Sequence, residues 1–297
     1  MPAPGSGPAF AALLIGNLSL AFGPWLVRLA DVGPVAAGFW RLALALPVLL
    51  LLMKATRQPV PPLPRATWVM LALGGLFFAA DLGAWHIGIR HTRLANATLF
   101  GNTASFIFAI YGFVVARSRP NRAQLAACVL ALAGAALLMG RSYELSRQYL
   151  VGDLLCVLAG IFYVFYLVAI DRSRGRIRNW PVLTLSTLFG VVPLLLFALL
   201  LGERVMPGDW TPLILLALGS QVIGQGLLVY AIGHLSPLVV GLGLLTQPAV
   251  ASTIGWLIYG ERLQPLDILG MVAIGAAMVL VRRPARGPET TAPPPPG

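Results

Sequence analysis

Ten stretches of nearly uninterrupted apolar residues follow one another along the chain, separated by short polar segments. They are Pro8–Leu29, Val35–Met53, Trp68–Ile89, Leu94–Ala116, Ala123–Gly140, Val151–Ile170, Val182–Leu201, Leu213–Ile232, Leu238–Tyr259 and Leu266–Val281. An α-helix needs ~20 residues to cross the hydrocarbon core of a bilayer. Backbone groups in lipid must satisfy their own hydrogen bonds, and the runs lack the alternation of barrel strands. The pattern therefore predicts an all-α integral membrane protein with ten transmembrane helices.

The chain also resembles itself when it is shifted by 145 positions. Leu71–Gly74 and Leu216–Gly219 both read LALG, and the turn at 90–93 falls on the turn at 234–237. The register holds without gaps, which indicates an internal duplication. We expect a first repeat at 1–142, a second at 149–283, and a disordered proline-rich tail at 284–297.

Each predicted repeat contains five helices, and five is an odd number. The second repeat therefore starts on the opposite side of the membrane from the first, so the halves are inverted repeats. This architecture is typical of secondary transporters, in which the binding site lies near mid-bilayer between the halves and alternating access exchanges their conformations. We expect a carrier rather than a channel because such halves are suited to rocking.

Composition and charge agree with this fold. The chain is 58% hydrophobic and 10% charged, with a mean hydropathy of +0.83, whereas soluble domains carry about 25% charged residues. The net charge of +11 comes from Arg in short loops, which indicates topology rather than nucleic-acid binding. Thirteen Lys and Arg lie on the side of the N-terminus and seven on the other. The positive-inside rule thus predicts a multi-pass inner-membrane protein with both termini cytoplasmic.

The ninth and tenth predicted helices carry a family resemblance. A proline early in a helix, Gly-Glu-Arg at its end, and then a proline and a glycine resemble the EamA repeat of the drug/metabolite transporter superfamily. The matching residues are Pro248, Gly260, Glu261, Arg262, Pro265 and Gly270. Arg41 resembles the family's arginine in the second helix. The first repeat has Thr103 in place of the proline and Ala116 in place of the glutamate, so we expect it to lack the helix kink.

The resemblance implies export of small organic solutes, and it is greatest to the amino-acid and metabolite exporters, including the aromatic amino-acid exporter type. An alternative is a proton-coupled drug exchanger or a nucleotide-sugar and metabolite exchanger. A nucleotide sugar would need buried cations for its phosphates, and only Arg41 is available. A proton-coupled pump would need a central carboxylate, for which Asp81 is the best candidate.

Polar and aromatic residues within the apolar runs are the candidate substrate contacts, since polar groups at membrane depth are costly and usually face a cavity or a partner. Asp81 could bind an ammonium group or a proton, or it could pair with Arg41. Asp81 and Trp85 share a helix face, whereas His86 lies about 140° from Asp81 around the helix. The predicted substrate-binding set is Asn17, Trp40, Asp81, Trp85, His86, Phe100, Asn102, Tyr163, Tyr166, Gln221, Gln225 and Gln247.

Each of these residues could instead pack between helices, because amides and hydroxyls also join helices in membranes. Tyr163 and Tyr166 could stack on an aromatic substrate or bind a cation through the ring face. We interpret Arg41, Pro248, Glu261 and Arg262 as structural or gating residues. Glu261 lies at a helix C-terminus, where the macrodipole disfavours an acid, so it should have a basic partner.

Other function classes find little support in the sequence. It contains no HExxH, no GxSxG and no His/Cys cluster, and its loops are too short for a catalytic domain, so we do not expect an enzyme. Cys128 and Cys156 lie inside apolar runs without metal-site spacing, and we expect no metal and no cofactor. The expected partners are a small-molecule substrate and the lipid bilayer. Alanines at four-residue spacing permit close helix packing, within a monomer or across a homodimer.

Overall fold

The computed structural model describes residues 6–92, 94–117, 120–140, 147–250, 253, 256 and 264–281, and these residues contain helices and no strand. In the first half the helices are α1 Ser6–Ala21, α2 Gly23–Leu29, α3 Pro34–Ala55, α4 Arg65–His91, α5 Leu94–Gly101, α6 Thr103–Ala116 and α7 Arg122–Gly140. In the second half they are α8 Leu150–Arg174, α9 Asn179–Leu200, α10 Thr211–Leu215, the π-helix η1 Leu216–Gln225, α11 Gly226–Ile232, α12 Pro237–Leu244 and α14 Pro265–Val281.

These segments correspond in order to the ten apolar runs, which confirms the predicted fold class. Within the described residues, six of the ten are long and apolar enough to span a membrane, and four are shorter apolar helices. Large apolar side chains on the outer faces are exposed, such as Val114 at 68% and Leu200 at 85%. In a bilayer these side chains contact lipid, so their exposure carries no hydrophobic penalty.

In the described residues three of the predicted helices are interrupted, the first, the fourth and, after α12, the ninth. The first is divided into α1 and α2 at Phe22, just before Gly23 and Pro24. The fourth is divided into α5 and α6 at Asn102, where the Ser105 N–H bonds the Asn102 carbonyl three residues back. The prediction that the first repeat lacks a kink was therefore wrong. The break forms without proline, since an i→i−3 hydrogen bond replaces the α-helical one at the join.

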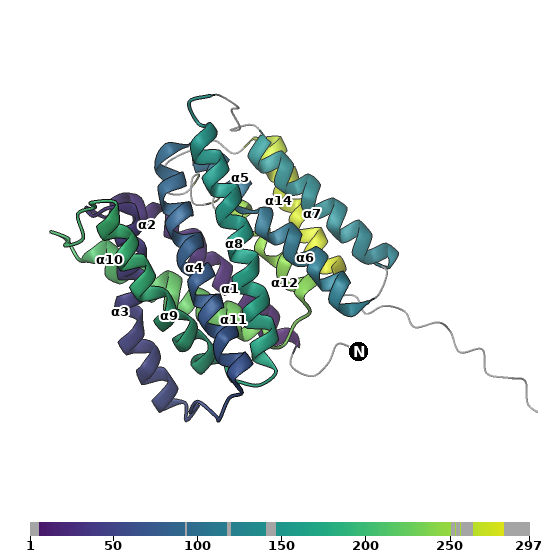
Figure 1. The fold of residues 1–297 in the computed structure, drawn as a ribbon. Coiled ribbons are helices and arrows are strands. Elements are labelled where there is room, and N and C mark those ends of the chain that lie inside the picture. The colour runs from purple at the N-terminus through teal and green to yellow at the C-terminus, as the bar shows by residue number, and fades with distance from the viewer. Residues whose placement is uncertain are drawn as a thin grey trace, which may run out of the picture.

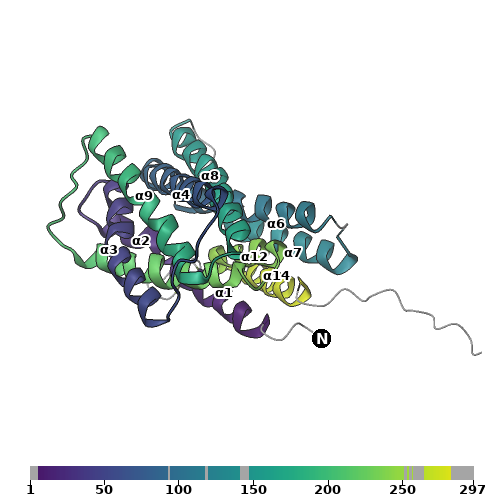
Figure 2. The ribbon, with the colours of Figure 1, turned by 60° about the horizontal axis from the view of Figure 1, so that its bottom comes forward.

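The contacts between the halves follow a pseudo-two-fold axis. Under the 145-residue shift α3 corresponds to α9 and α7 to α14, and each of these helices packs against its own counterpart. The α4–α8 contact likewise has a mate in the contact of α1 with η1 and α11. Figures 1 and 2 show α7 beside α14 and α3 beside α9. Elements that meet their own counterparts must lie on the axis, which gives two inverted repeats of five helices.

Close backbone contact explains why glycine occurs at the α7–α14 crossing. A Cβ on Gly134 would lie 2.7 Å from the Gly270 carbonyl oxygen, and a Cβ on Gly270 would lie 2.8 Å from that of Gly134. Small residues let membrane helices approach closely. The spaced alanines Ala127, Ala131 and Ala135 are buried in the same cluster, so their faces serve packing within the chain.

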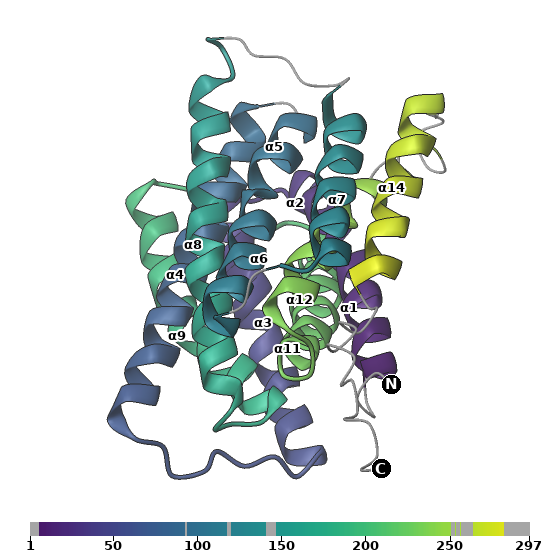
Figure 3. The same ribbon diagram turned by 90° about the vertical axis from the view of Figure 1, so that its right-hand side faces the viewer.

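Figure 3 shows α1 beginning on the same face as the loop that joins α3 to α4. We call this the N-terminal face and the other the opposite face. Chain direction then places every helix end: α6 and α8 end on the N-terminal face, whereas α4 and α9 end on the opposite face.

Candidate functional site

A cavity of about 120 Å³ lies between the two halves. The volume suits a small solute, because one water needs about 10–15 Å³ on the same scale. Polar and charged groups from both repeats line it: Arg41, Asp81, Asn102, Ser105, Tyr163, Gln225 and Gln247. Such groups at membrane depth are expensive unless they face a partner or a cavity.

Arg41 of α3 is the basic group of the cavity. It is 4% exposed, and its Nε donates to Gln221 Oε1 at 3.2 Å. Gln221 in turn donates from Nε2 to the Thr187 hydroxyl at 2.9 Å, which fixes the amide orientation. The guanidinium lies 5.6 Å from the Phe78 ring centroid, a cation–π distance. Within the described residues no hydrogen bond engages its Nη groups, so they remain available to a ligand.

Asp81 of α4 is the acidic group. It lines the same cavity as Arg41, and their opposite charges attract. In the described part of the chain they do not reach ion-pair distance, so the alternative of a direct buried ion pair is not realised. Trp85, one helical turn beyond Asp81, lines the cavity too, as the shared helix face predicts.

Tyr163 of α8 connects the aromatic and amide groups. Its hydroxyl accepts a hydrogen bond from Gln225 Nε2 at 3.2 Å, and its ring lies 5.7 Å from that of Tyr166. Tyr166 is fully buried behind the cavity wall, stacks on Phe78 at 4.4 Å, and donates to Gln225 Oε1 at 3.5 Å. Tyr163 therefore faces the cavity, while Tyr166 supports the residues that line it.

Asn102 and Gln247 occupy equivalent places in the two repeats, 145 residues apart, and both line the cavity. Asn102 lies at the break between α5 and α6. Gln247 follows the end of α12, where the N–H groups of Leu245 and Thr246 bond carbonyls three residues back. Each repeat thus presents one amide at an interrupted helix, the arrangement in which transporters build substrate sites.

Other predicted contacts lie outside the cavity lining in the described residues. Asn17 joins α1 to α12 by donating to the Gly243 carbonyl at 2.7 Å, and it accepts from Gln247 Nε2 at 3.5 Å. Gln221 supports Arg41 from behind. Phe100 packs in a neighbouring apolar cluster with Ala97.

His86 is fully buried next to the start of α3. Its Nδ1 lies 2.8 Å from the Pro34 carbonyl oxygen, which can only accept, so this nitrogen carries the proton. Its Nε2 has no partner among the described residues.

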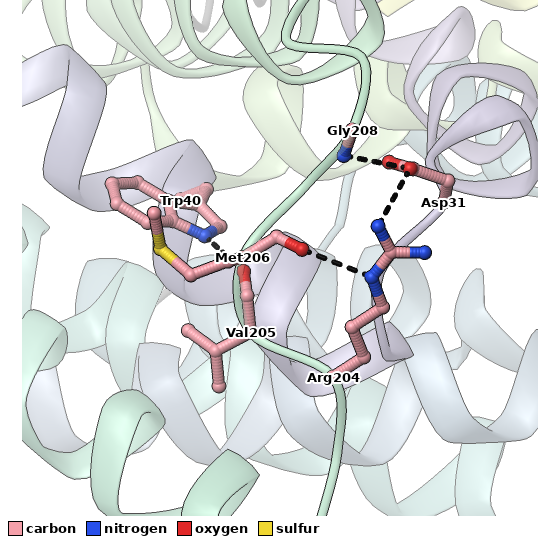
Figure 4. A network of polar contacts seen from close by, with 6 residues as sticks. All are labelled: Asp31, Trp40, Arg204, Val205, Met206 and Gly208. Carbon is pink, nitrogen blue, oxygen red and sulfur yellow. Dashed lines mark hydrogen bonds and ion pairs between the residues drawn. The ribbon is translucent and has the colours of Figure 1, made fainter.

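Trp40 lies on the opposite face in a polar network (Figure 4). Its indole N–H donates to the Val205 carbonyl at 2.7 Å, and its ring meets Trp210 edge-on at 4.8 Å. In the same network Asp31 pairs with Arg204 at 3.5 Å and accepts from the Gly208 N–H. Trp40 thus fastens the loop between α9 and α10 to α3.

Pro248 follows the interruption after α12, where the sequence places a freed carbonyl. Glu261 and Arg262 lie outside the described residues. Sequence reasoning missed the small residues that make room for the cavity, among them Gly101, Ala104, Ala159 and Gly160. Their only sequence signal is small size near the middle of a run, which ordinary helix packing also produces.

The chain matches known proteins over most of its length. The model of the "EamA-like transporter family" matches residues 7–140 and 150–283. The "Pseudopaline exporter CntI" of Pseudomonas aeruginosa (strain UCBPP-PA14) is 26% identical over 253 residues, covering 84% of this chain and 86% of that protein. The "Uncharacterized transporter YdfC" of Bacillus subtilis (strain 168) is 26% identical over 268 residues, covering 89% and 87%.

A solved crystal structure has the same fold, with a TM-score of 0.78 at 17% identity, covering 95% of this chain and 97% of the other. The family match spans both repeats, and the named relatives are transporters. These findings confirm the resemblance that the ninth and tenth helices carry. The chain is a multi-pass membrane protein that belongs to the EamA-like transporter family of the drug/metabolite transporter superfamily.

Proposed function

We propose that this protein is a secondary transporter that exports small organic solutes, with amino acids as the leading class, by alternating access through the central cavity. The observation that supports this most is the presence of Arg41 and Asp81 on one cavity without a direct ion pair. A solute that carries both a carboxylate and an ammonium group satisfies both charges at once. An isolated charge at this depth is costly, and a solute that pairs with both charges offsets that cost, which favours its binding.

The substrate carboxylate takes the Nη groups of Arg41, since guanidinium binds carboxylate in a planar, two-point geometry. The ammonium group lies at Asp81. Asn102, Gln225 and Gln247 supply neutral hydrogen bonds to both groups, and each amide offers a donor and an acceptor. Trp85, Phe78 and Tyr163 flank the charged pair, which favours a side chain that is apolar or aromatic.

The direction and location follow from topology. The loops and termini that the sequence assigns to the side of the N-terminus hold thirteen Lys and Arg and those of the other side hold seven, which by the positive-inside rule supports cytoplasmic termini in an inner membrane. The family relative that is named as an exporter supports outward transport. The two inverted halves then expose the cavity to the cytoplasm and to the other side in turn.

Counterflow in proteoliposomes tests the proposal. Vesicles that contain the purified protein are loaded with one unlabelled amino acid, and uptake of labelled aromatic and aliphatic amino acids is followed without an ion gradient. Transient accumulation that saturates identifies a carrier for that class. Arg41→Lys should reduce it at least about tenfold, because the charge stays while the two-point geometry is lost.

An absence of uptake across the amino-acid panel, from protein shown to be folded, would contradict this substrate class. The second candidate is then a proton-coupled drug or metabolite exchanger, which the carboxyl group of Asp81 on the cavity favours. In that case an imposed pH gradient should drive uptake of a cationic drug. Asp81→Asn should remove the dependence on the gradient and retain exchange.

A further inference from the structure

Two helix caps on opposite faces are copies of one contact. On the opposite face, the Glu203 carboxylate accepts from the N–H groups of Val35 and Ala36 at the start of α3, at 3.2 and 2.8 Å. On the N-terminal face, Gln58 Oε1 accepts from the N–H of Trp180 at the start of α9, at 3.3 Å. Gln58 and Glu203 are 145 residues apart, as are Val35 and Trp180.

The second cap has one bond fewer for a simple reason. The residue equivalent to Ala36 is Pro181, which has no N–H to donate. Each of the two antiparallel helices is therefore capped by the loop that follows the other. The caps fasten α3 to α9 at both membrane faces.

The symmetry of the two repeats predicts which of these contacts persist during transport, an inference that rests on the proposed alternating access. If the halves exchange conformations during transport, a contact present on both faces in one state is present on both faces in the other. The paired caps of α3 and α9 are then a fixed frame. A contact that has no equivalent in the other repeat is not bound by this symmetry, so it can exist in only one of the two states.

The hydrogen bond between α6 and α8 has no equivalent. The Tyr111 hydroxyl donates to Asp171 Oδ2 at 3.0 Å, and the neighbouring Arg172 also interacts with Tyr111. The equivalent positions in the other repeat are Trp256 and Leu26. A leucine side chain offers no acceptor, so this bond cannot form between the equivalent residues.

The bond lies between the cavity and the N-terminal face. Tyr111 is six residues beyond the cavity residue Ser105, about 9 Å along α6, and Asp171 is eight beyond Tyr163, about 12 Å along α8. Towards the opposite face, by contrast, the cavity lining extends to Pro24, Trp85 and Ala97.

Tight packing surrounds the bond. The fully buried Phe108 stacks on Tyr111 with ring centroids 5.5 Å apart. At Gly112, the residue after Tyr111, a Cβ would lie 2.6 Å from the Leu238 backbone nitrogen, so α6 touches the backbone of α12. The N-terminal side of the cavity is therefore closed by packed side chains and backbone, with the Tyr111–Asp171 bond joining α6 to α8.

We propose that the Tyr111–Asp171 hydrogen bond is the gate on the N-terminal face. It is closed in this conformation and breaks when α6 and α8 part to open the cavity to that face. The caps at Gln58 and Glu203 stay intact throughout. Tyr111 and Asp171 act on the balance between the two states and do not touch the solute.

Cysteine labelling from each side tests this proposal. Ala104 lines the cavity and is 2% exposed, so Ala104→Cys is the reporter, in a chain with Cys128→Ser and Cys156→Ala. A membrane-impermeant maleimide is applied to right-side-out cells and to inside-out vesicles. Tyr111→Phe should raise the labelling rate from the N-terminal face about tenfold, the value of one hydrogen bond to a charged group, and lower the rate from the opposite face.

Asp171→Ala should give the same shift, whereas Asp171→Asn should give a smaller one because its amide oxygen still accepts. The matched control is Gln58→Ala, which removes a bond on the same face that has an equivalent. It should lower the unfolding temperature and leave the sidedness of labelling unchanged. Unchanged sidedness in Tyr111→Phe, from a variant that elutes as folded protein, overturns the gate.

An equal shift in Gln58→Ala also overturns the gate, since it would mean general loosening of that face. The labelling needs no substrate. A failure of counterflow with a normal labelling shift would therefore reject the amino-acid class and leave the gate standing.

Discussion

The third and eighth transmembrane helices occupy equivalent places in the two repeats and start alike, yet they fold differently. Leu71–Gly74 and Leu216–Gly219 both read LALG. The first stretch belongs to the α-helix α4, and the second lies in the π-helix η1, Leu216–Gln225. A π-helix has more residues per turn, so side chains rotate progressively away from the faces they would take in an α-helix.

The rotation changes which residues face inward. Gln221 is fully buried and holds Arg41, while its equivalent Leu76 is 48% exposed on the lipid side. Gln225 lines the cavity, whereas its equivalent Ala80 lines a separate apolar pocket. Thus α4 supplies the acid of the site and η1 supplies one of its three amides, Gln225. Inverted repeats can differ in their chemistry while they keep one fold, because local helix geometry is free to vary within it.

The largest expected difference concerns binding. Asp81→Asn should weaken amino-acid counterflow at least about tenfold, whereas Gln225→Ala should weaken it about two- to fivefold, because hydrogen bonds to charged groups exceed neutral ones. Apparent affinities from counterflow measure both effects. Leu76→Ala, on the lipid side, is the control that should change nothing. Equal losses in Asp81→Asn and Gln225→Ala would contradict the division of charge and amide between the two helices.

The second largest expected difference between α4 and η1 is in how far a glycine-to-alanine substitution lowers the free energy of unfolding. A Cβ on Gly75 would lie 2.6 Å from the Phe189 Cβ on α9, whereas the nearest atom to a Cβ on Gly219 is the Ser19 hydroxyl at 3.9 Å. Gly75→Ala should therefore lower the free energy of unfolding by about 1–3 kcal/mol through overpacking. Gly219→Ala should change it by less than about 0.5 kcal/mol, and thermal unfolding in detergent compares the two. A larger loss in Gly219→Ala would mean that η1 is the more tightly packed helix.

Removal of the serine hydroxyls around η1 should change the free energy of unfolding by smaller amounts, in opposite directions at the two positions. Ser19 donates to the Gly219 carbonyl at 2.8 Å, and Ser19→Ala should lower the free energy of unfolding by about 0.6 kcal/mol. The Ser220 hydroxyl is buried without a partner in the described residues. Ser220→Ala should be neutral or slightly stabilising, because it removes an unsatisfied polar group. The same thermal assay applies, and a loss in Ser220→Ala would reveal a partner for that hydroxyl.

The smallest expected effect on the unfolding temperature is at Asp209, just before the start of α10. Asp209, equivalent to Pro64 before α4, is fully exposed and accepts from the Thr211 N–H at 2.9 Å, which lowers the pKa of its carboxyl. A lowered pKa stabilises the fold above the usual value and loses that contribution as the pH falls through the lowered pKa. Asp209→Asn should lower the unfolding temperature by under about 1 °C at pH 7 and by less near pH 3. An effect that grows on acidification would contradict this sign.

The sequence determined the architecture of this protein. Apolar run length fixed ten helices, since lipid leaves the backbone no other way to satisfy its hydrogen bonds. The 145-residue repeat with five helices per half required inversion, and the residues around Pro248 and Gly270 indicated the family. Asp81, Arg41 and the mid-helix amides were found as candidates because polar groups at that depth need a reason to be there.

Only the tertiary structure separated residues on the cavity from residues behind it. Gln221 and Gln225 look alike on a helical wheel, but η1 and the partners Arg41 and Thr187 place one behind the wall and the other on it. The helix break at Asn102 could not be predicted, because no proline marks it in the sequence. Helix geometry and side-chain direction depend on tertiary neighbours that are more than a hundred residues away in the sequence. The apolar pattern along one helix therefore cannot predict them.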